Sequence, residues 1–170
     1  ADFDKWLEIT GGSEVQNISA AIAGTELIEL RWQDAWPGAN TDLDLYLLNS
    51  SATVVLASSL DPQSGGLSAI PYESISGKVS TGYKIAIQHF SGPAPAWIEL
   101  RMFVGSELSD PVAAGSIGNP ATSANTGTLA VGAAAWSSTS TIESFSSQGP
   151  TIDGRIKPDI VGADGANSAS

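Results

Sequence analysis

The chain has 170 residues, a length that allows one domain or one domain and part of a second. Its formal net charge is −11 at pH 7, with only seven Lys and Arg residues, which argues against a nucleic-acid partner because phosphate binding needs a basic surface. The absence of cysteine excludes disulfides and thiolate metal sites. No apolar run reaches membrane-spanning length and no leader-like segment begins the sequence, so we expect an internal fragment without a membrane partner.

Apolar and polar residues alternate with a period of two along most of the first hundred residues, as expected for half-buried strands. Clusters of Gly, Pro, Asn and Ser separate the alternating runs at intervals typical of antiparallel sandwiches. We therefore predict a mainly β chain in which residues 1–105 form an antiparallel β-sandwich of about eight strands. The predicted strands cover residues 6–9, 15–22, 26–32, 42–48, 53–57, 70–75, 83–90 and 97–103.

Beyond Val104 the alternation is lost, and Gly, Ala, Ser and Asn dominate residues 111–127. Residues 128–134 form a run of small, mostly apolar side chains, which predicts a strand of a parallel sheet that is covered on both faces. A single strand of this kind cannot bury itself. We therefore predict that residues 106–170 are an incomplete segment of a larger α/β domain whose other strands lie elsewhere in a parent chain.

Asp42 and Asp44 are two residues apart on a predicted strand, so both side chains point to one face while Leu43 and Leu45 point to the other. Two carboxylates with a nearby carbonyl or amide oxygen are able to hold Ca²⁺, which takes about six to eight oxygen ligands. Alternatively, the pair orders the preceding loop by accepting hydrogen bonds from its backbone amides. Asp34 fits either arrangement. Calcium at this pair is the one metal prediction, and no cofactor is expected to be required.

We make predictions for three further side chains, because tryptophan and histidine often serve binding or catalysis. Trp36 follows a predicted strand in a loop with a Pro-Gly turn signal, so we expect it to be exposed and to be the aromatic residue that faces any ligand. Trp32, at the end of the strand, is expected in the core. His89 is the one histidine of the chain and lies in an alternating run, which favours a structural role.

Three segments near the end of the sequence occur in a recognisable order: GTLAVGAAA at residues 127–135, IESFSSQGP at residues 142–150 and GRIKPDIV at residues 154–161. Their order and spacing resemble the run that precedes the nucleophile in subtilisin-like serine proteases, the subtilases. The resemblance implies a parent serine endopeptidase that hydrolyses peptide bonds through an acyl-enzyme. It also implies that residues 106–170 belong to a subtilisin-type α/β catalytic domain.

The resemblance names no catalytic residue in this chain. Subtilases carry their catalytic Asp and His upstream of these segments and their Ser in a Gly-Thr-Ser motif downstream, and the sequence contains neither that motif nor a His-Gly-Thr run. Acyl transfer needs a nucleophile, a base and an orienting acid in contact. We therefore expect the chain to be inactive alone, with the remainder of its own catalytic domain as partner and with peptides as substrates of the parent.

Lys157, Pro158 and Asp159 match the K-P-D turn of the family. The resemblance implies that this turn supports the catalytic domain, with the aspartate tying down backbone amides near the nucleophile loop. Residues 161–165 (VGADG) replace the usual Ala-Pro-Gly, so the approach to the nucleophile is expected to differ in shape.

Gly118, Asn119 and Pro120 contain a Gly-Asn pair that is superficially similar to the oxyanion-hole segment of subtilases. Their position shortly before the predicted strand at residues 128–134 better matches the segment that passes beside the primary specificity pocket. We therefore predict that these three residues neighbour that pocket.

The first part of the chain carries a resemblance of its own. The runs LRWQDAW (residues 30–36), NTDLDLYL (residues 40–47) and YKIAI (residues 83–87) are similar to the pre-peptidase C-terminal sandwich domains of secreted bacterial peptidases. In some subtilases such a sandwich is inserted into the catalytic domain. The resemblance implies a secreted, bacterial protein whose accessory sandwich modulates substrate access, substrate binding or stability.

Two other outcomes stay open at this point. One is a stand-alone carbohydrate-binding or adhesion sandwich followed by a linker. The other is that the segment after residue 105 packs on the sandwich or self-associates with a second copy, because an unpaired parallel strand with an apolar surface seeks a partner.

Overall fold

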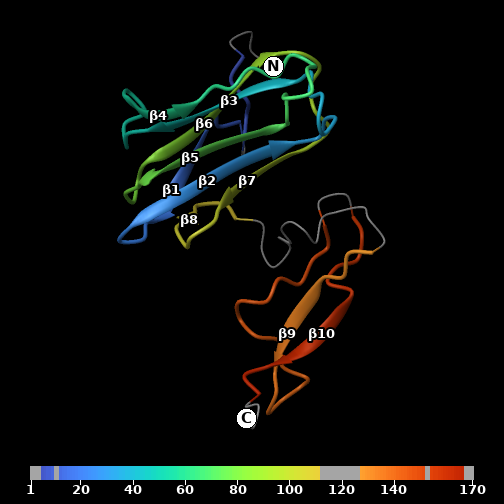
Figure 1. The fold of residues 1–170 in the computed structure, drawn as a ribbon. Coiled ribbons are helices and arrows are strands. Elements are labelled where there is room, and N and C mark those ends of the chain that lie inside the picture. Colours follow the sequence, from blue (N-terminus) through green and yellow to red (C-terminus); the bar gives the residue numbers. More distant parts are fainter. Residues whose placement is uncertain (1–4, 10–11, 112–126, 152–153, 167–170) are drawn as a thin grey trace. The chain divides into compact units, whose positions relative to one another are not determined.

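The computed structural model describes residues 5–9, 12–111, 127–151 and 154–166. It divides into two compact units, Ala1–Pro111 and Val112–Ser170, whose strands are drawn in Figure 1. Strands are the only regular secondary structure in the described parts of the chain, as predicted for a mainly β protein. Consistent with this, the described residues contain no helix that is long and apolar enough to span a membrane.

The first unit is an antiparallel β-sandwich, which confirms the predicted fold class. Its described part contains eight strands: β1 (Val15–Ala20), β2 (Thr25–Trp32), β3 (Asp42–Leu48), β4 (Val55–Ser59), β5 (Tyr72–Lys78), β6 (Lys84–Ser91), β7 (Ile98–Met102) and β8 (Glu107–Leu108). One sheet has the order β4-β3-β6-β1-β8 and the other has the order β5-β2-β7. Every pair of neighbouring strands within these two sheets is antiparallel.

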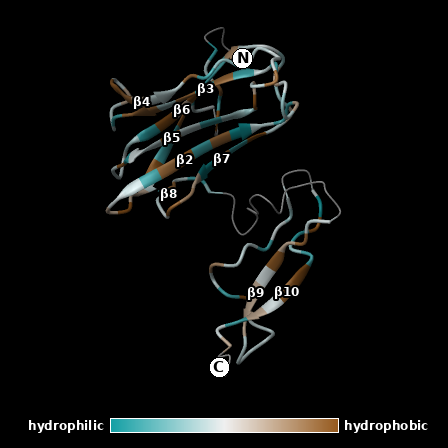
Figure 2. Ribbon diagram, in the orientation of Figure 1, coloured by the Kyte–Doolittle hydropathy of each residue, from teal (hydrophilic) through white to brown (hydrophobic). Residues whose placement is uncertain are grey.

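The core lies between the two sheets and follows from the alternation in β2 and β3. Leu43, Leu45 and Leu47 of β3 face inward, as do Leu30 and Trp32 of β2, and all five side chains are buried. Figure 2 shows the alternation as hydrophobic and hydrophilic bands along these strands. Burying one face of each strand fixes its register, since a slip by one residue would turn the apolar side chains outward.

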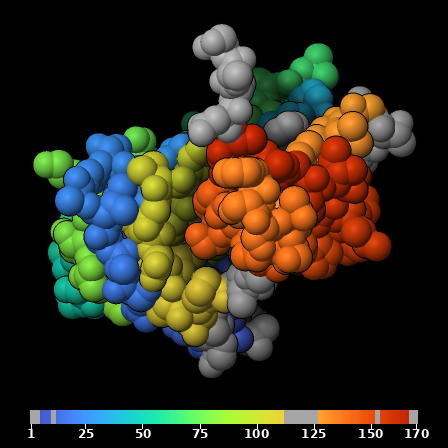
Figure 3. Space-filling model, turned by 90° about the horizontal axis from the view of Figure 1, so that it is seen from below, coloured from blue at the N-terminus to red at the C-terminus, as the bar shows by residue number. Residues whose placement is uncertain are grey.

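The edges of the sandwich differ from the sequence-based prediction. Residues 6–9 form no strand: Trp6 makes one isolated bridge to Gln88 of β6. At the other end, the short strand β8 pairs with β1, so the first unit continues to Pro111 rather than changing near residue 105. Figure 3 shows the yellow segment that contains β7 and β8 lying beside the blue strands of the first unit.

A buried carboxylate orders the chain between β7 and β8. Glu26 accepts hydrogen bonds from the amides of Leu27 (3.0 Å), Val104 (2.7 Å) and Ser106 (2.8 Å). Burial opposes ionisation, but these amides together hold the pKa of Glu26 below its ordinary value. The corner that leads into β8 is therefore fastened to β2 by one ionised side chain.

The second unit contains two described strands, β9 (Val131–Ala135) and β10 (Ile160–Asp164). They are parallel and in register over their whole length, from Ile160 beside Val131 to Asp164 beside Ala135. The predicted parallel strand is thus present, and a partner strand lies in this chain rather than elsewhere. Val131 is 59% exposed in this chain, so coverage of the strand on both faces, which was expected in the complete domain, stays a prediction.

Candidate functional site

The start of β9 is held by Asp159, which directly precedes β10. The amide of Ala130 donates a hydrogen bond to Asp159 Oδ2 (2.8 Å), and the amide of Asp159 donates to the carbonyl of Ala130 (2.8 Å). One residue thus satisfies both polar backbone groups of Ala130, which is itself buried. This is the geometry that the K-P-D interpretation requires, while its link to a nucleophile loop stays a prediction.

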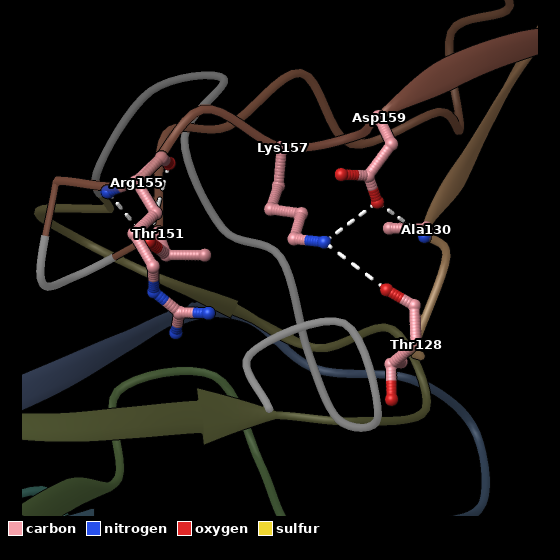
Figure 4. A network of polar contacts seen from close by, with 6 residues as sticks. All are labelled: Thr128, Ala130, Thr151, Arg155, Lys157 and Asp159. Carbon is pink, nitrogen blue, oxygen red and sulfur yellow. Dashed lines mark hydrogen bonds and ion pairs between the residues drawn. The ribbon is translucent and has the colours of Figure 1, made fainter. Parts of the chain in front are cut away.

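Lys157 completes this cluster, as Figure 4 shows. Its Nζ donates to Asp159 Oδ2 (2.6 Å) and to the carbonyl of Thr128 (3.3 Å), and its side chain is 10% exposed. The hydrogen bond from Lys157 and the one from the Ala130 amide hold the pKa of Asp159 below its usual range. Residues 128–130 are therefore fixed to the segment before β10 by charge-assisted hydrogen bonds, which are the strong ones in proteins.

The third member of the K-P-D turn, Pro158, packs against β9. A Cβ placed on Gly132 would lie 2.9 Å from Pro158 Cγ and 3.2 Å from Ser146 Oγ, so the strand has no room for a side chain there. Ser146 Oγ accepts the amide of Ala133 (2.9 Å), which anchors the FSSQGP loop to the same strand. The sequence analysis identified these motifs but not their contacts; the Gly within the V-G-A run is the signal that could have indicated this close approach.

The segment between the FSSQGP loop and the K-P-D turn is closed by backbone contacts. Gly149 has φ +68°, and a Cβ on it would lie 1.8 Å from the carbonyl oxygen of Lys157, so only glycine fits. Thr151 is buried; its amide donates to the carbonyl of Arg155 (3.0 Å), and its Oγ1 accepts the amide of Arg155 (3.0 Å). All three sequence motifs thus meet in one hydrogen-bonded cluster.

The side chains of this cluster hold backbone groups in place. Ser146, a serine in the loop beside β9, has its hydroxyl engaged with peptide groups, since it accepts from Ala133 and donates to the carbonyl of Ser147 (3.4 Å). His89 belongs to β6 of the first unit, where its backbone amide donates to the carbonyl of Lys5 (2.8 Å). We assign no catalytic role to either side chain.

In the first unit, Asp34 orders the loop before β3. Its Oδ2 accepts the amides of Asn40 (2.8 Å) and Thr41 (2.7 Å), and its Oδ1 accepts the amide of Ala35 (2.7 Å). Burial opposes ionisation of Asp34, but these three amides hold its pKa below the ordinary value. The loop-ordering role considered for Asp42 and Asp44 therefore belongs to Asp34.

Asp42 and Asp44 lie on the outer face of the larger sheet, opposite the core leucines, and each is 7% exposed. Tyr46 contacts Asp44 Oδ2 through its hydroxyl (3.4 Å) and also contacts Gln88 Oε1 (3.1 Å). Burial and then the charge of Asp42 raise the pKa of Asp44. Within the described residues no group of three or more His, Asp or Glu side chains is placed to hold a metal, so the acidic ligands of any calcium ion here would be these two carboxylates.

The remaining predicted residues divide into two groups. Trp36 is 59% exposed, as predicted, and Trp32 is buried, with its Nε1 donating to the carbonyl of Thr41 (3.2 Å). A ligand for Trp36 stays a prediction. The segment with the predicted specificity-pocket neighbours lies outside the described residues; it comprises Gly118, Asn119 and Pro120.

Comparison with models of known protein families gives a match for this chain. The model of the subtilase family matches residues 75–170, more than half of the sequence. The match begins inside β5 and includes the FSSQGP loop, the K-P-D turn and both strands of the second unit; its start does not coincide with the boundary between the two units. No curated protein and no solved structure gives a significant match. On the strength of the family match and the motif cluster that it covers, the chain belongs to the subtilase family.

Proposed function

We propose that the chain is a non-catalytic part of a secreted, bacterial subtilisin-like serine endopeptidase. Its second unit contributes β9, β10 and the K-P-D turn to a catalytic domain whose Asp, His and Ser lie in other segments. The observation that carries this proposal is the fastening of Ala130 by Asp159 and Lys157 within the family match. The cluster fixes backbone without activating a nucleophile, which suits a support for a neighbouring catalytic loop.

The partner of the second unit is the remainder of the same catalytic domain. Parallel sheets are normally covered on both faces, yet large apolar side chains of β9, β10 and the adjacent loops are exposed. These side chains are Leu129, Val131, Phe145, Ile156, Ile160 and Val161. Additional strands and helices of the complete domain would remove this apolar surface from water, which stabilises folding by about 25 cal/mol per Å².

The first unit acts as an accessory domain that modulates substrate access, substrate binding or stability. Support comes from its self-contained core and from the exposed Trp36, which offers a flat apolar surface at a loop. The same exposed ring is the observation that favours the second candidate function, a carbohydrate-binding or adhesion sandwich. Binding of polysaccharides by the intact chain that is lost in Trp36→Ala would favour the second candidate.

The proposal is tested by measuring casein hydrolysis with and without a serine-directed inhibitor. We expect no inhibitor-sensitive hydrolysis from this chain alone and clear inhibitor-sensitive hydrolysis from the protein encoded by the complete reading frame. Hydrolysis by this chain alone, or none by the complete protein, would show the proposal to be wrong.

The support role is tested in the complete protein by substitution of Asp159. Asp159→Ala removes the acceptor of the Ala130 amide and leaves the ammonium of Lys157 without its carboxylate, so we expect kcat to fall roughly tenfold or more. Asp159→Asn retains one oxygen acceptor and is expected to lose less. The control is Asp164→Ala, which removes an exposed carboxylate from β10. Equal activity of Asp159→Ala and the control would contradict the role.

A further inference from the structure

The outer face of the larger sheet holds two carboxylates that are shielded from water. Asp42 and Asp44 alternate with Leu43 along β3, so both point away from the core, with Cα atoms about 6.8 Å apart as expected for residues two apart in an extended strand. Positions on an outer sheet face are ordinarily solvated, but each aspartate is only 7% exposed. Shielding an ionised carboxylate from water is unfavourable unless another group replaces the lost hydration.

The hydrogen bonds in the described part of the chain do not replace that hydration. Asp42 Oδ1 is buried and has no hydrogen-bond partner among the described residues. The hydroxyl of Tyr46 is the donor near Asp44, and it lies closer to Gln88 Oε1 (3.1 Å) than to Asp44 Oδ2 (3.4 Å). A phenol carries one hydrogen, so it satisfies one of these oxygens at a time. Asp44 Oδ2 and Gln88 Oε1 therefore share the single hydroxyl proton of Tyr46.

Within the part of the chain that the structure describes, no positive side chain forms an ion pair with Asp42 or Asp44 either. The ion pairs found among the described residues join Glu99 to two arginines and Asp159 to Lys157. Lys5, near the end of β6, directs its Nζ to the carbonyl of Phe90 (3.1 Å) and lies over the ring of the same residue. The two carboxylates thus gather negative charge and acceptor oxygens without a cation from the described protein.

We propose that Asp42 and Asp44, together with Gln88 Oε1, bind a calcium ion on the outer face of the larger sheet. Gln88 lies directly opposite Asp44 in the ladder between β3 and β6, so its side chain shares their face. The proposed ligands are oxygens only, which suits Ca²⁺; zinc prefers nitrogen and sulfur, and magnesium demands near-ideal octahedral geometry. This site is independent of the proposed peptidase role.

The affinity follows from the composition of the site. With two carboxylates and no third acidic group in the described surroundings, the remaining ligands are neutral oxygens and water. Sites of low ligand charge in extracellular modules bind Ca²⁺ with Kd on the order of 10⁻⁴ to 10⁻³ M, and we expect this range. The competing solution to the buried charge is a proton shared between the two carboxyl groups, which would respond to pH but not to calcium.

The test uses the full chain after treatment with a chelator. Calcium binding is measured by isothermal titration calorimetry, and the unfolding temperature is measured with and without about 10 mM CaCl₂ at matched ionic strength. The variants are Asp42→Asn and Asp44→Asn. Asp110→Asn serves as the matched control because it removes the same charge from an exposed position of the same unit.

We expect calcium to raise the unfolding temperature of the original chain and of Asp110→Asn. In Asp42→Asn and Asp44→Asn the affinity for calcium should fall roughly tenfold or more. Without calcium these two variants should unfold at the same temperature as the original chain or higher, because each removes a buried charge that repels its neighbour. No response at about 10 mM calcium, or an equal response in all variants, would overturn the proposal.

If a variant does not fold, a second measurement tests whether calcium binds at the proposed site. In the unmodified chain, addition of calcium should shift the NMR signals of the Gln88 side-chain amide and of the backbone amides of residues 42–46. Shifts that are centred elsewhere, or that magnesium reproduces at the same concentration, would overturn the site.

Discussion

Glu73 is a buried group that contributes to the pH dependence of the stability of the sandwich. It is 1% exposed, and its Oε1 accepts the amide of Asp61 and the Nε2 of Gln63, both at 2.9 Å. Burial raises the pKa of Glu73, and the hydrogen bonds from Ser59 and Gln63 offset only part of that effect. A raised pKa in the folded state means that the folded chain holds the proton more tightly than the unfolded chain.

The raised pKa of Glu73 means that the folded chain loses stability as the pH rises. The contribution of protonated Glu73 is fully present below the unfolded pKa and is lost as the pH rises through the higher folded pKa. Glu73→Gln keeps one oxygen for Asp61 and Gln63 and presents an amide group to Ser59. We therefore expect this variant to unfold at the same or a higher temperature at about pH 7, and to lose less stability than the original chain between about pH 4.5 and pH 7.

Glu26→Gln is the matched comparison, because Glu26 is equally buried but its pKa is lowered rather than raised. Its carboxylate accepts three backbone amides, and a glutamine would turn an NH₂ group towards one of them. We expect a loss of about 1.5–3 kcal/mol in the free energy of unfolding at neutral pH, which diminishes as the pH falls through the folded pKa. Thermal unfolding from about pH 4 to pH 8 checks both variants, and the same sign for both would contradict this reasoning.

At the scale of elements, the second unit depends on the close approach of the K-P-D turn to β9. Gly132→Ala would place a methyl group 2.9 Å from Pro158 Cγ, a contact that rigid neighbours cannot accept. We expect a loss of about 1–3 kcal/mol from the overpacking. Amide hydrogen exchange of β9 and β10 is the measurement, since it reports this unit separately from the sandwich.

The control for that substitution lies in the same sheet. A Cβ on Gly162 of β10 would meet Val131 Cγ1 at 3.2 Å, but Val131 is largely exposed and is able to turn away. Gly162→Ala should therefore cost much less than Gly132→Ala. Equal exchange rates in the two variants would show that the contact with Pro158 does not matter.

The elements that could be predicted from the sequence are those with strong local patterns. The alternation in β2 and β3 predicted both strands and their inward faces because burial of one face requires that period. In contrast, β8 has two residues and exists only through pairing with β1, and β10 was not separated from the motif that contains it. Pairing between distant segments leaves no local signal, so neither strand could be found in this way.

In the candidate site, too, the residues with a local motif could be predicted from the sequence, whereas their contacts with distant segments could not. The motif resemblance located Asp159 and Lys157 but not their contacts with residues 128–130, which lie about thirty positions earlier in the chain. The role expected of Asp42 and Asp44 in ordering a loop went to Asp34, because only the folded loop shows which carboxylate faces its amides. Spacing along a strand predicts a shared face, but it does not say which donors will reach that face.

At the scale of the whole chain, the two units differ in how well their strands are covered. β3 lies between β4 and β6, and its inward leucines are almost fully buried. β9 has β10 as its strand partner in the described residues, and Val131 and Ile160 are more than half exposed. Since slow exchange needs buried, doubly paired backbone, we expect the β9 amides to exchange at least about a hundredfold faster than those of β3.

The concentration dependence of that exchange separates two partners of the exposed strands. If the remainder of the catalytic domain is the partner, the β9 amides of this chain should exchange at the same fast rate at every protein concentration, and light scattering should report a monomer. If copies of the chain associate through β9 and β10, protection should increase with concentration because the same strands would then be covered. Protection equal to that of β3 at the lowest concentration would contradict both, since it would require a covering surface within the chain itself.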